Sequence, residues 1–467
     1  MIYAQFQNNI DSLINNIAFP TKSVALAVSG GSDSLALLML VHRWATDHQL
    51  SLVVMSVDHH LRKQSKVEND YVCTLSEQLK CKHYLLHFDH QNNFSNLQAR
   101  AREARYQLMT DLCIKLDILT LLTAHHLDDY IENYYMSLEK KSSLFGLSQC
   151  NINWYNNVRI VRPLFNIPKR QLVEYLVKKD VKWFEDESNL SDKYRRNVIR
   201  KTLTMVNDDS KNQIILQISM INQVVEEILK PEFIACTAES VKIYEFGFAT
   251  INLLKFAEFA SEIQLQTFSF ILIMISGKNR SSRSESLNLI MNLLKQKKNF
   301  IKTLHGCMVK KIQDNLIIYR EFGRKEPVNI LLDDNKLKWD DRFLFSIPNI
   351  LYHTIDSNGL DVRDEKKIVD FSEKAPNHNE SKSRAMPYIT NLTVEDYTKI
   401  KQYLDLKMLK KLSQNNHIAI LFTLPTVKIL EKVIAIPHIY YYDREYLDGD
   451  LYISFSPNFV SRFTHFC

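Results

Sequence analysis

Glycine is scarce in this sequence, with only nine glycines among 467 residues. Soluble proteins usually contain about 7% glycine, so this chain has few positions that favour a positive φ angle. Two of the nine, Gly30 and Gly31, are adjacent. An ordinary turn would explain such a pair, but its rarity here directs attention to the residues around it.

Long apolar runs and paired cysteines are also absent. The longest apolar runs, such as residues 270–275, are far shorter than the roughly 20 residues that cross a bilayer. The first residues lack the basic and apolar regions of a signal peptide. The seven cysteines are odd in number and never spaced as CxxC, which disfavours disulfide, zinc and iron–sulfur frameworks. We therefore expect a cytoplasmic protein with reduced cysteines and no membrane partner.

Composition predicts a globular protein with more than one domain. Apolar residues make up 45% and charged residues 24%, which excludes disordered and collagen-like chains. The net charge of +6 permits a polyanionic partner without requiring one. We place a catalytic domain at residues 1–205, a mainly helical domain at 206–325, and a smaller C-terminal α+β domain at 326–467.

Residues 23–135 alternate between apolar strand patterns and helical patterns. This alternation predicts an α/β fold with a doubly wound parallel sheet covered on both faces. Ligands of such sheets bind beyond the carboxyl ends of the strands, where polar residues follow three of the runs. The expected strands cover 23–28, 51–58, 83–89 and 117–124, and the expected helices cover 35–44, 68–79 and 96–113.

The segment SGGSDS follows the first expected strand. Two glycines allow a sharp turn and a close approach to a ligand, and the next helix offers free amides and a positive dipole end. The segment is neither a Walker loop nor a GxGxxG fingerprint. A carboxylate beside phosphates needs Mg²⁺ between them, and a helix-capping turn is the simpler alternative. The candidate phosphate-binding residues are Ser29, Gly30, Gly31, Ser32, Asp33 and Ser34.

Acidic residues crowd the segment AHHLDDYIEN. The spacing of His125, Asp128, Asp129 and Glu132 predicts that all four share one helical face. Carboxylates so close together repel unless they hold a metal ion or a cationic group such as an ammonium substrate. A solvated acidic helix start is the alternative.

Two further candidate functional segments are basic. Arg102 and Arg105 lie near one face of an expected helix, where they suit bidentate phosphate contact, although a solvent-facing basic helix has the same spacing. Residues 162–201 contain eleven Lys or Arg against six Asp or Glu, with interleaved aromatics. This pattern is typical of an RNA surface or of an ordinary solvated one. The candidates for RNA contact are Lys169, Arg170, Arg195, Arg196, Asn197 and Arg200, and this RNA is a tRNA if the family resemblance given below holds.

The SGGSDS segment resembles the PP-loop of the N-type ATP pyrophosphatases, an adenine nucleotide alpha-hydrolase-like fold. Together with VDHHLR, ARxxRY, AHHLDDYIEN, RPL and RRNxIR, it resembles the tRNA(Ile)-lysidine synthases, specifically over residues 22–202 and more loosely to 325. Four positions depart from the family pattern. They are His60, Tyr130, Asn133 and Glu187, where the family usually has glycine, glutamine, threonine and proline.

The resemblance implies an ATP-dependent ligase that attaches free L-lysine to C2 of the wobble cytidine in isoleucine tRNA with a CAU anticodon. The reaction would pass through an adenylated cytidine, release pyrophosphate and AMP, and change codon reading from AUG to AUA and charging from methionine to isoleucine. ATP and Mg²⁺ are the expected cofactors. A homodimer is the assembly we allow for.

The resemblance also implies residue roles. Asp33 and Asp128 would hold the metal, Asp129 and Glu132 would bind the lysine ammonium, and His125 or a nearby carboxylate would act as base. Arg102 or Arg105 would stabilise the transferred phosphate. The alternatives are another PP-loop enzyme such as a tRNA thiolase, which usually has a cysteine pair, or a non-catalytic tRNA-binding relative.

Overall fold

The computed structural model describes most of the chain. His60, Asn96 and Glu187 lie outside the described residues, as do the last four residues of the VDHHLR motif. None of the helices in the described ranges combines the length and apolar character that a bilayer crossing needs. The described residues are 2–14, 22–58, 65–88, 97–156, 158–185, 195–278, 281–282, 284–296, 298–322, 329–331, 336–346, 350–351, 353–354, 368–369, 384–385, 387–414, 416–429, 431–443 and 452–456.

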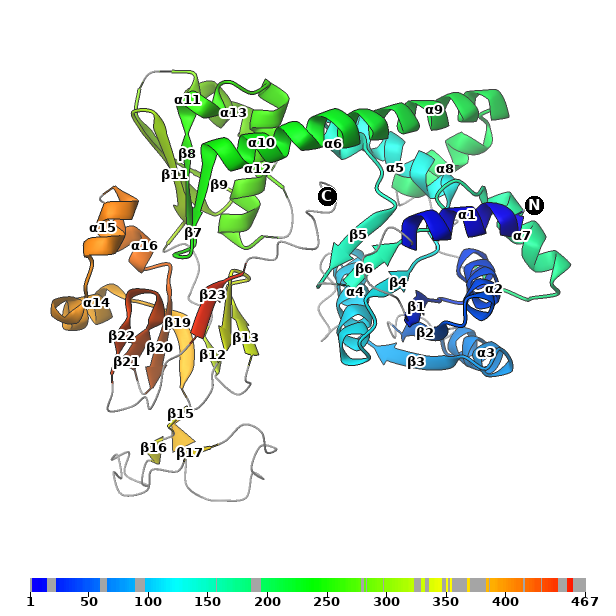
Figure 1. Cartoon of the computed structure of the whole chain (residues 1–467), viewed down its shortest axis with the longest axis horizontal. Helices are drawn as coiled ribbons and strands as arrows, with labels where there is room; N and C mark the ends of the chain where they lie inside the picture. The colour runs from blue at the N-terminus through cyan, green and yellow to red at the C-terminus, as the bar shows by residue number, and fades with distance from the viewer. Residues whose placement is uncertain are drawn as a thin grey trace. The chain divides into compact units, whose positions relative to one another are not determined.

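The described chain forms two compact units, Met1–Lys230 and Pro231–Phe459. The first unit contains a six-stranded sheet in the order β3-β2-β1-β4-β6-β5 (Figure 1). Every neighbouring pair is parallel except β5 with β6. The strands are β1 (Ser23–Ala27), β2 (Ser51–Asp58), β3 (Lys82–His87), β4 (Thr120–Leu122), β5 (Ile152–Tyr155) and β6 (Val158–Val161).

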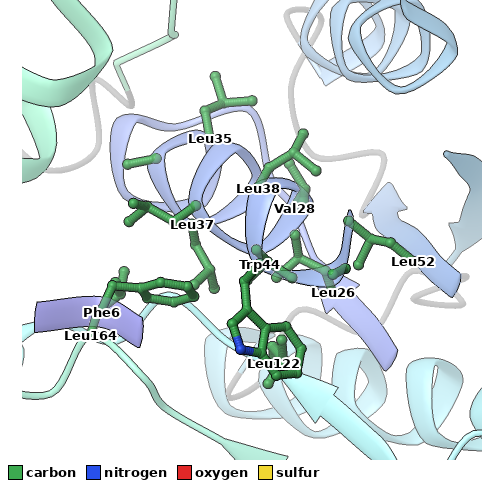
Figure 2. Close-up of a cluster of buried hydrophobic side chains, with 14 of the residues drawn as sticks. Phe6, Leu26, Val28, Leu35, Leu37, Leu38, Trp44, Leu52, Leu122 and Leu164 are labelled. Atoms are coloured by element: carbon green, nitrogen blue, oxygen red, sulfur yellow. The ribbon is translucent and has the colours of Figure 1, made fainter. Parts of the chain in front are cut away.

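Helices cover both faces of this sheet, which confirms the doubly wound α/β class. Alternate strand residues face opposite sides. Leu26 of β1 packs with Trp44, and Figure 2 shows them in one buried cluster with Leu122. On the other face, Ala25 of β1 packs with Met109. The helices are α1 (Ile2–Ile14), α2 (Ser32–Asp47), α3 (Ser65–Gln78), α4 (Leu97–Lys115), α5 (Leu127–Glu139), α6 (Leu144–Leu147), α7 (Lys169–Lys178), α8 (Arg195–Thr204) and α9 (Asp208–Val224).

The four expected strands are confirmed, and the last of them is much shorter than expected. The run 51–58 forms β2 over its whole length, whereas the run 117–124 contributes only Thr120–Leu122. Asp117 has a φ angle of +55°, so the chain is still turning there. Six cysteines within the described ranges are free thiols, as expected.

The second unit begins with helices and a five-stranded antiparallel sheet in the order β7-β8-β11-β10-β9. Strands β10 and β11 form an antiparallel hairpin within this sheet. The other three strands are four or five residues long, too short to give a clear sequence pattern. The elements here are η2 (Val225–Leu229), which precedes the unit, then α10 (Lys230–Ser240), β7 (Val241–Tyr244), β8 (Phe248–Asn252), α11 (Leu253–Phe256), α12 (Ser261–Ser276), α13 (Ser284–Leu294), β9 (Phe300–Leu304), β10 (Cys307–Ile312) and β11 (Asn315–Arg320).

The remainder of the second unit is α+β, as expected. Its principal sheet has the order β12-β19-β20-β21-β22 and is wholly antiparallel. The three-domain division proposed from the sequence stays a prediction. The elements are β12 (Ile330–Leu331), β13 (Lys336–Trp339), β14 (Phe343–Ser346), β15 (Ile350–Leu351), β16 (His353–Thr354), β17 (Ile368–Val369), β18 (Arg384–Ala385), β19 (Tyr388–Asn391), α14 (Val394–Ile400), η3 (Lys401–Tyr403), α15 (Lys407–Ser413), α16 (His417–Leu421), β20 (Pro425–Ile429), β21 (Lys432–Ile436), η4 (Pro437–Ile439), β22 (Tyr441–Tyr442) and β23 (Tyr452–Phe455).

Candidate active site

A cavity of about 690 Å³ opens at the carboxyl ends of β1, β2 and β4. The strand order reverses between β1 and β4, which is where doubly wound sheets bind ligands. We call it the sheet-end cavity. Its lining includes members of each of the four groups of candidate residues from the sequence, namely residues 29 and 31–34, Arg102, Arg105, His125, Asp129, Lys169, Arg196 and Arg200.

The glycine turn joins β1 to α2 in the conformation that its composition predicts. Gly30 has a φ angle of +82°, in the left-handed region that favours glycine. The Ser34 hydroxyl donates to the Gly31 carbonyl at 2.9 Å, and the Ser29 amide donates to the Ser34 hydroxyl at 3.2 Å. The turn is therefore held by its own serines, and α2 begins at Ser32 with its first-turn amides directed at the cavity.

His126 lies at the centre of three carboxylates from two helices. Its Nε2 is 3.5 Å from both Asp33 and Asp129, and its Nδ1 is 3.5 Å from Asp128. The imidazole side chain is only 3% exposed. Its backbone is fixed as well, because its amide donates to Asp129 at 3.1 Å and it forms a parallel bridge with Leu164.

These contacts set the charge of the site. Burial alone would lower the pKa of His126, but the three facing carboxylates raise it to about 10, so the ring is a cation at neutral pH. Burial alone would raise the pKa of Asp33, yet His126 and Lys169 hold it below its ordinary value. The pKa of Asp128 is likewise lowered to about 2, against the effect of burial, by His126 and the backbone amide of Lys169.

Two arginines of α8 approach the acidic face of α5. Glu132, whose side chain is 2% exposed, accepts from Nε of Arg196 and from Nε of Arg200, each at 2.6 Å. Arg196 also donates to Asp129 at 2.9 Å. The acidic face of α5 is therefore already paired with cations from within the same unit.

The resulting carboxylate–cation network has no net charge. It contains four carboxylates and four cations linked by contacts of 2.6 to 3.5 Å. Opposite charges at these distances offset the repulsion among the converging carboxylates. The members are Asp33, Asp128, Asp129 and Glu132 with His126, Lys169, Arg196 and Arg200.

The expected placement of His125 on the α5 face is wrong. Helix α5 begins at Leu127 with His126 as its N-cap, so His125 precedes the helix. The end of the preceding strand sets the position of His125 instead. Its Nδ1 is 3.2 Å from the Thr123 hydroxyl. Burial and the nearby charges of Arg162, Arg102 and Arg196 hold the pKa of His125 well below its usual range, so the ring is neutral.

The six candidates for tRNA contact separate into distinct environments. Lys169, Arg196 and Arg200 line the cavity as part of the network, and Asn197 is buried. Arg170 and Arg195 are exposed, paired respectively with Glu174 on the same helix and with Glu139. Of the four departures from the family pattern, Tyr130 is buried and donates to the Asn151 side chain at 2.8 Å.

The sequence reasoning missed His126 and the position of Lys169. His126 was overlooked because its neighbour fitted a helical spacing that begins two residues too early. The available signal was the pair Asp128 and Asp129, since acidic residues are common in the first turn of a helix. Lys169 places its ammonium 3.3 Å from Asp33, a contact across 136 residues that no local pattern shows.

Comparison with known proteins covers the whole chain. A family model for the PP-loop domain matches residues 2–207. The tRNA(Ile)-lysidine synthase of Rickettsia felis is 52% identical over 467 residues, and that of Rickettsia typhi is 51% identical over 469, with 100% of each chain covered. Among solved structures, the U34-tRNA thiolase NcsA of Methanococcus maripaludis aligns with 48% of this chain and 80% of its own, at 17% identity and a TM-score of 0.40.

The similarity to known proteins covers the same residues that form the site. The PP-loop match contains the glycine turn, α5 and α8, and the full-length identity extends through both compact units. More than half of all positions are identical over the entire length of the chain. This identity assigns the chain to a single family. The chain belongs to the tRNA(Ile)-lysidine synthase family, enzymes with a PP-loop domain that use ATP.

Proposed function

We propose that this chain joins free lysine to C2 of the wobble cytidine in isoleucine tRNA with a CAU anticodon. The C2 oxygen attacks the α-phosphorus of ATP and pyrophosphate leaves; the ε-amine of lysine then attacks C2, and AMP leaves with that oxygen. One observation carries the proposal: the glycine turn and the acidic α5 residue Asp129 line a single cavity. Groups suited to phosphate and groups suited to an ammonium ion are therefore neighbours.

The glycine turn is the proposed seat of the pyrophosphate portion of ATP. Gly31 carries no Cβ, and a Cβ built there would meet only ordinary contacts at 3.8 and 3.9 Å. The first-turn amides of α2 and the hydroxyl of Ser32 face the same space. Such preorganised donors stabilise charge that develops as the α–β bond breaks.

Asp33 fits a role in holding Mg²⁺. Mg²⁺ is commonly held by one or two carboxylates together with substrate phosphates, and Asp33 lines the cavity beside the turn. Asp128 does not line the cavity, and its carboxylate accepts from the Lys169 amide at 2.8 Å. Within the described residues, no three His, Cys, Asp or Glu side chains form a metal-holding group. When bound, Mg²⁺ would offset phosphate charge.

Asp129 and Glu132 remain the proposed site for the α-ammonium of lysine, since the ε-amine must stay free to attack. Glu132 is paired with two arginines, so an entering ammonium exchanges with a resident cation. Arg196 is the partner common to both carboxylates. We propose that the ammonium takes its place.

His125 is the proposed acceptor of the proton that the lysine ε-amine must lose. A neutral imidazole is required for that role, and the lowered pKa of His125 keeps it neutral. Arg102 and Arg105 line the same cavity and are proposed to contact the transferred phosphate.

The exposed Arg170 and Arg195 are the proposed contacts with the tRNA backbone in the catalytic domain, 1–205. We propose that the domains at 206–325 and 326–467 bind the remainder of the tRNA. A thiolase reaction is disfavoured because no cysteine is found among the described residues that line the cavity. A homodimer remains a proposal.

The test is mass spectrometry of the wobble nucleoside after incubation of the chain with ATP, Mg²⁺, lysine and the tRNA transcript. We expect cytidine to be converted to its lysine adduct, and radiolabelled lysine to enter the RNA. A transcript with uridine at the wobble position is the matched control. ATP consumption without lysine in the RNA would refute the proposal, and pyrophosphate release that survived Asp33→Ala would refute the metal role.

A further inference from the structure

One buried polar group beside the glycine turn has no role in the network or in the fold. Asn69 of α3 is 8% exposed, and its Nδ2 has no hydrogen-bond partner among the described residues. An amide that is removed from water without a partner destabilises the folded protein. An apolar side chain of similar size would avoid this loss of stability. The presence of an amide here is therefore explained best by a hydrogen-bond partner from outside the chain.

Asn69 belongs to the lining of the sheet-end cavity together with Ser29 and Gly31. Helix α3 packs against the turn itself, because a Cβ built on Gly30 would lie 3.4 Å from Cβ of Glu68. One turn further along α3, Val72 is fully buried in the core. The helix is thus anchored, and it holds the amide at the wall of the cavity.

We propose that Nδ2 of Asn69 donates a hydrogen bond to an oxygen of the bound nucleotide. This inference rests on the proposed function, because it takes the sheet-end cavity to be the ATP site. A neutral amide suits this position, because three cations that line the cavity, Lys169, Arg196 and Arg200, are already paired with carboxylates. The amide can approach a phosphate or ribose oxygen without breaking one of those pairs.

The competing explanation is that Asn69 supports the fold, and Asn9 provides the matched control. Asn9 is also buried in the same unit, at 7% exposure, but lies outside the cavity. Its Nδ2 donates to the Pro163 carbonyl at 2.8 Å and to the Asn166 side chain at 2.6 Å. Replacing Asn9 breaks bonds in the free protein, whereas replacing Asn69 breaks none that the described residues make.

The experiment measures two quantities for the wild type, Asn69→Leu, Asn69→Ala and Asn9→Leu. They are the Kd for α,β-methylene-ATP by calorimetry and the thermal midpoint of the nucleotide-free protein. We expect both Asn69 variants to bind the analogue about tenfold more weakly. Asn69→Leu should keep or raise the midpoint. Asn9→Leu should lower the midpoint and keep the affinity.

Unchanged affinity in the Asn69 variants would overturn the inference, and so would a lowered midpoint without any loss of affinity. Asn69→Ala adds no bulk, so a shared loss of affinity cannot come from a clash. Failure of the wild type to bind the analogue would instead refute the proposed function. Repeating the titration with AMP locates the acceptor: a loss for AMP as well indicates the ribose or α-phosphate, and a loss for the triphosphate alone indicates the β- or γ-phosphate.

Discussion

The ammonium of Lys169 lies 3.3 Å from Oδ2 of Asp33. Lys169→Met removes one of the cations that neutralise the Asp33 carboxylate. The carboxylate would then repel the phosphates of ATP. We expect the KM for ATP in pyrophosphate release to rise about tenfold. The unfolding free energy should change by less than about 1 kcal/mol, because the pair is partly exposed. Arg170→Met, one residue further along α7 and outside the cavity, is the control and should leave KM unchanged.

His126 should matter for both stability and rate. His126→Asn removes a buried cation from between three carboxylates, which then repel one another. We expect the unfolding free energy to fall by about 3 kcal/mol, measured in urea, and kcat to fall about a hundredfold. His42→Asn is the control, since His42 contacts the Leu79 carbonyl away from the cavity. A wild-type kcat in His126→Asn would show that the charge of His126 does not affect the rate.

Glu132 and Glu139 form a matched pair on α5, since both bind arginines of α8. The side chain of Glu132 is 2% exposed and that of Glu139 is 40% exposed. Glu132→Gln should cost about 2 to 3 kcal/mol of unfolding free energy, because it leaves two arginines facing a neutral group. Glu139→Gln should lower the unfolding free energy much less, because solvent screens the exposed pair of Glu139 and Arg195. Chemical denaturation checks both, and equal losses would show that burial does not govern these pairs.

Alanine substitutions at the two adjacent glycines should differ in their effects on stability and on ATP binding. Gly30 has a φ angle of +82°, whereas Gly31 has a φ angle of −77°. Gly30→Ala should cost about 1 to 2 kcal/mol of stability through backbone strain. Gly31→Ala should keep the stability and weaken ATP binding, because its methyl group enters the space proposed for phosphate. Thermal unfolding and ATP titration of both variants separate the two effects.

His438 should make the second unit sensitive to acid. Its ring nitrogens are buried without partners among the described residues, and burial and Arg342 lower the pKa of His438 to about 4. In the unfolded chain the pKa returns to its ordinary value near 6.5. The unfolded state therefore binds the proton first, and up to about 3 kcal/mol of stability is lost as the pH falls from 6.5 to 4. His438→Phe should remove that part of the pH dependence in urea unfolding; the same slope in both proteins would argue against it.

Local patterns predicted the parts of the site that are local. The run at 51–58 became β2 without change because it is a continuous apolar segment with a polar end. The glycine turn was predictable because positive φ and phosphate contact both favour glycine. Each of these needs only neighbours along the chain.

The remainder depends on contacts that spacing cannot reveal. Arg196 and Arg200 were assigned to tRNA because they sit in a basic segment, yet they pair with Glu132 across 64 and 68 residues. His125 was placed on a helix that begins two residues later. An ion pair between distant segments is fixed by tertiary packing, and a helix start is the least predictable part of a helix.

The separation of α5 from α8 has a consequence for synthesis. Asp129 and Glu132 leave the ribosome more than 60 residues before the arginines that pair with them. Until α8 has emerged, the growing chain carries an acidic α5 face that repels a polyphosphate. A product truncated before Arg195 therefore keeps the glycine turn, His126 and Lys169 but lacks the two arginines that pair with the acidic face of α5. The nucleotide site is therefore complete only after residues far beyond the glycine turn have been translated.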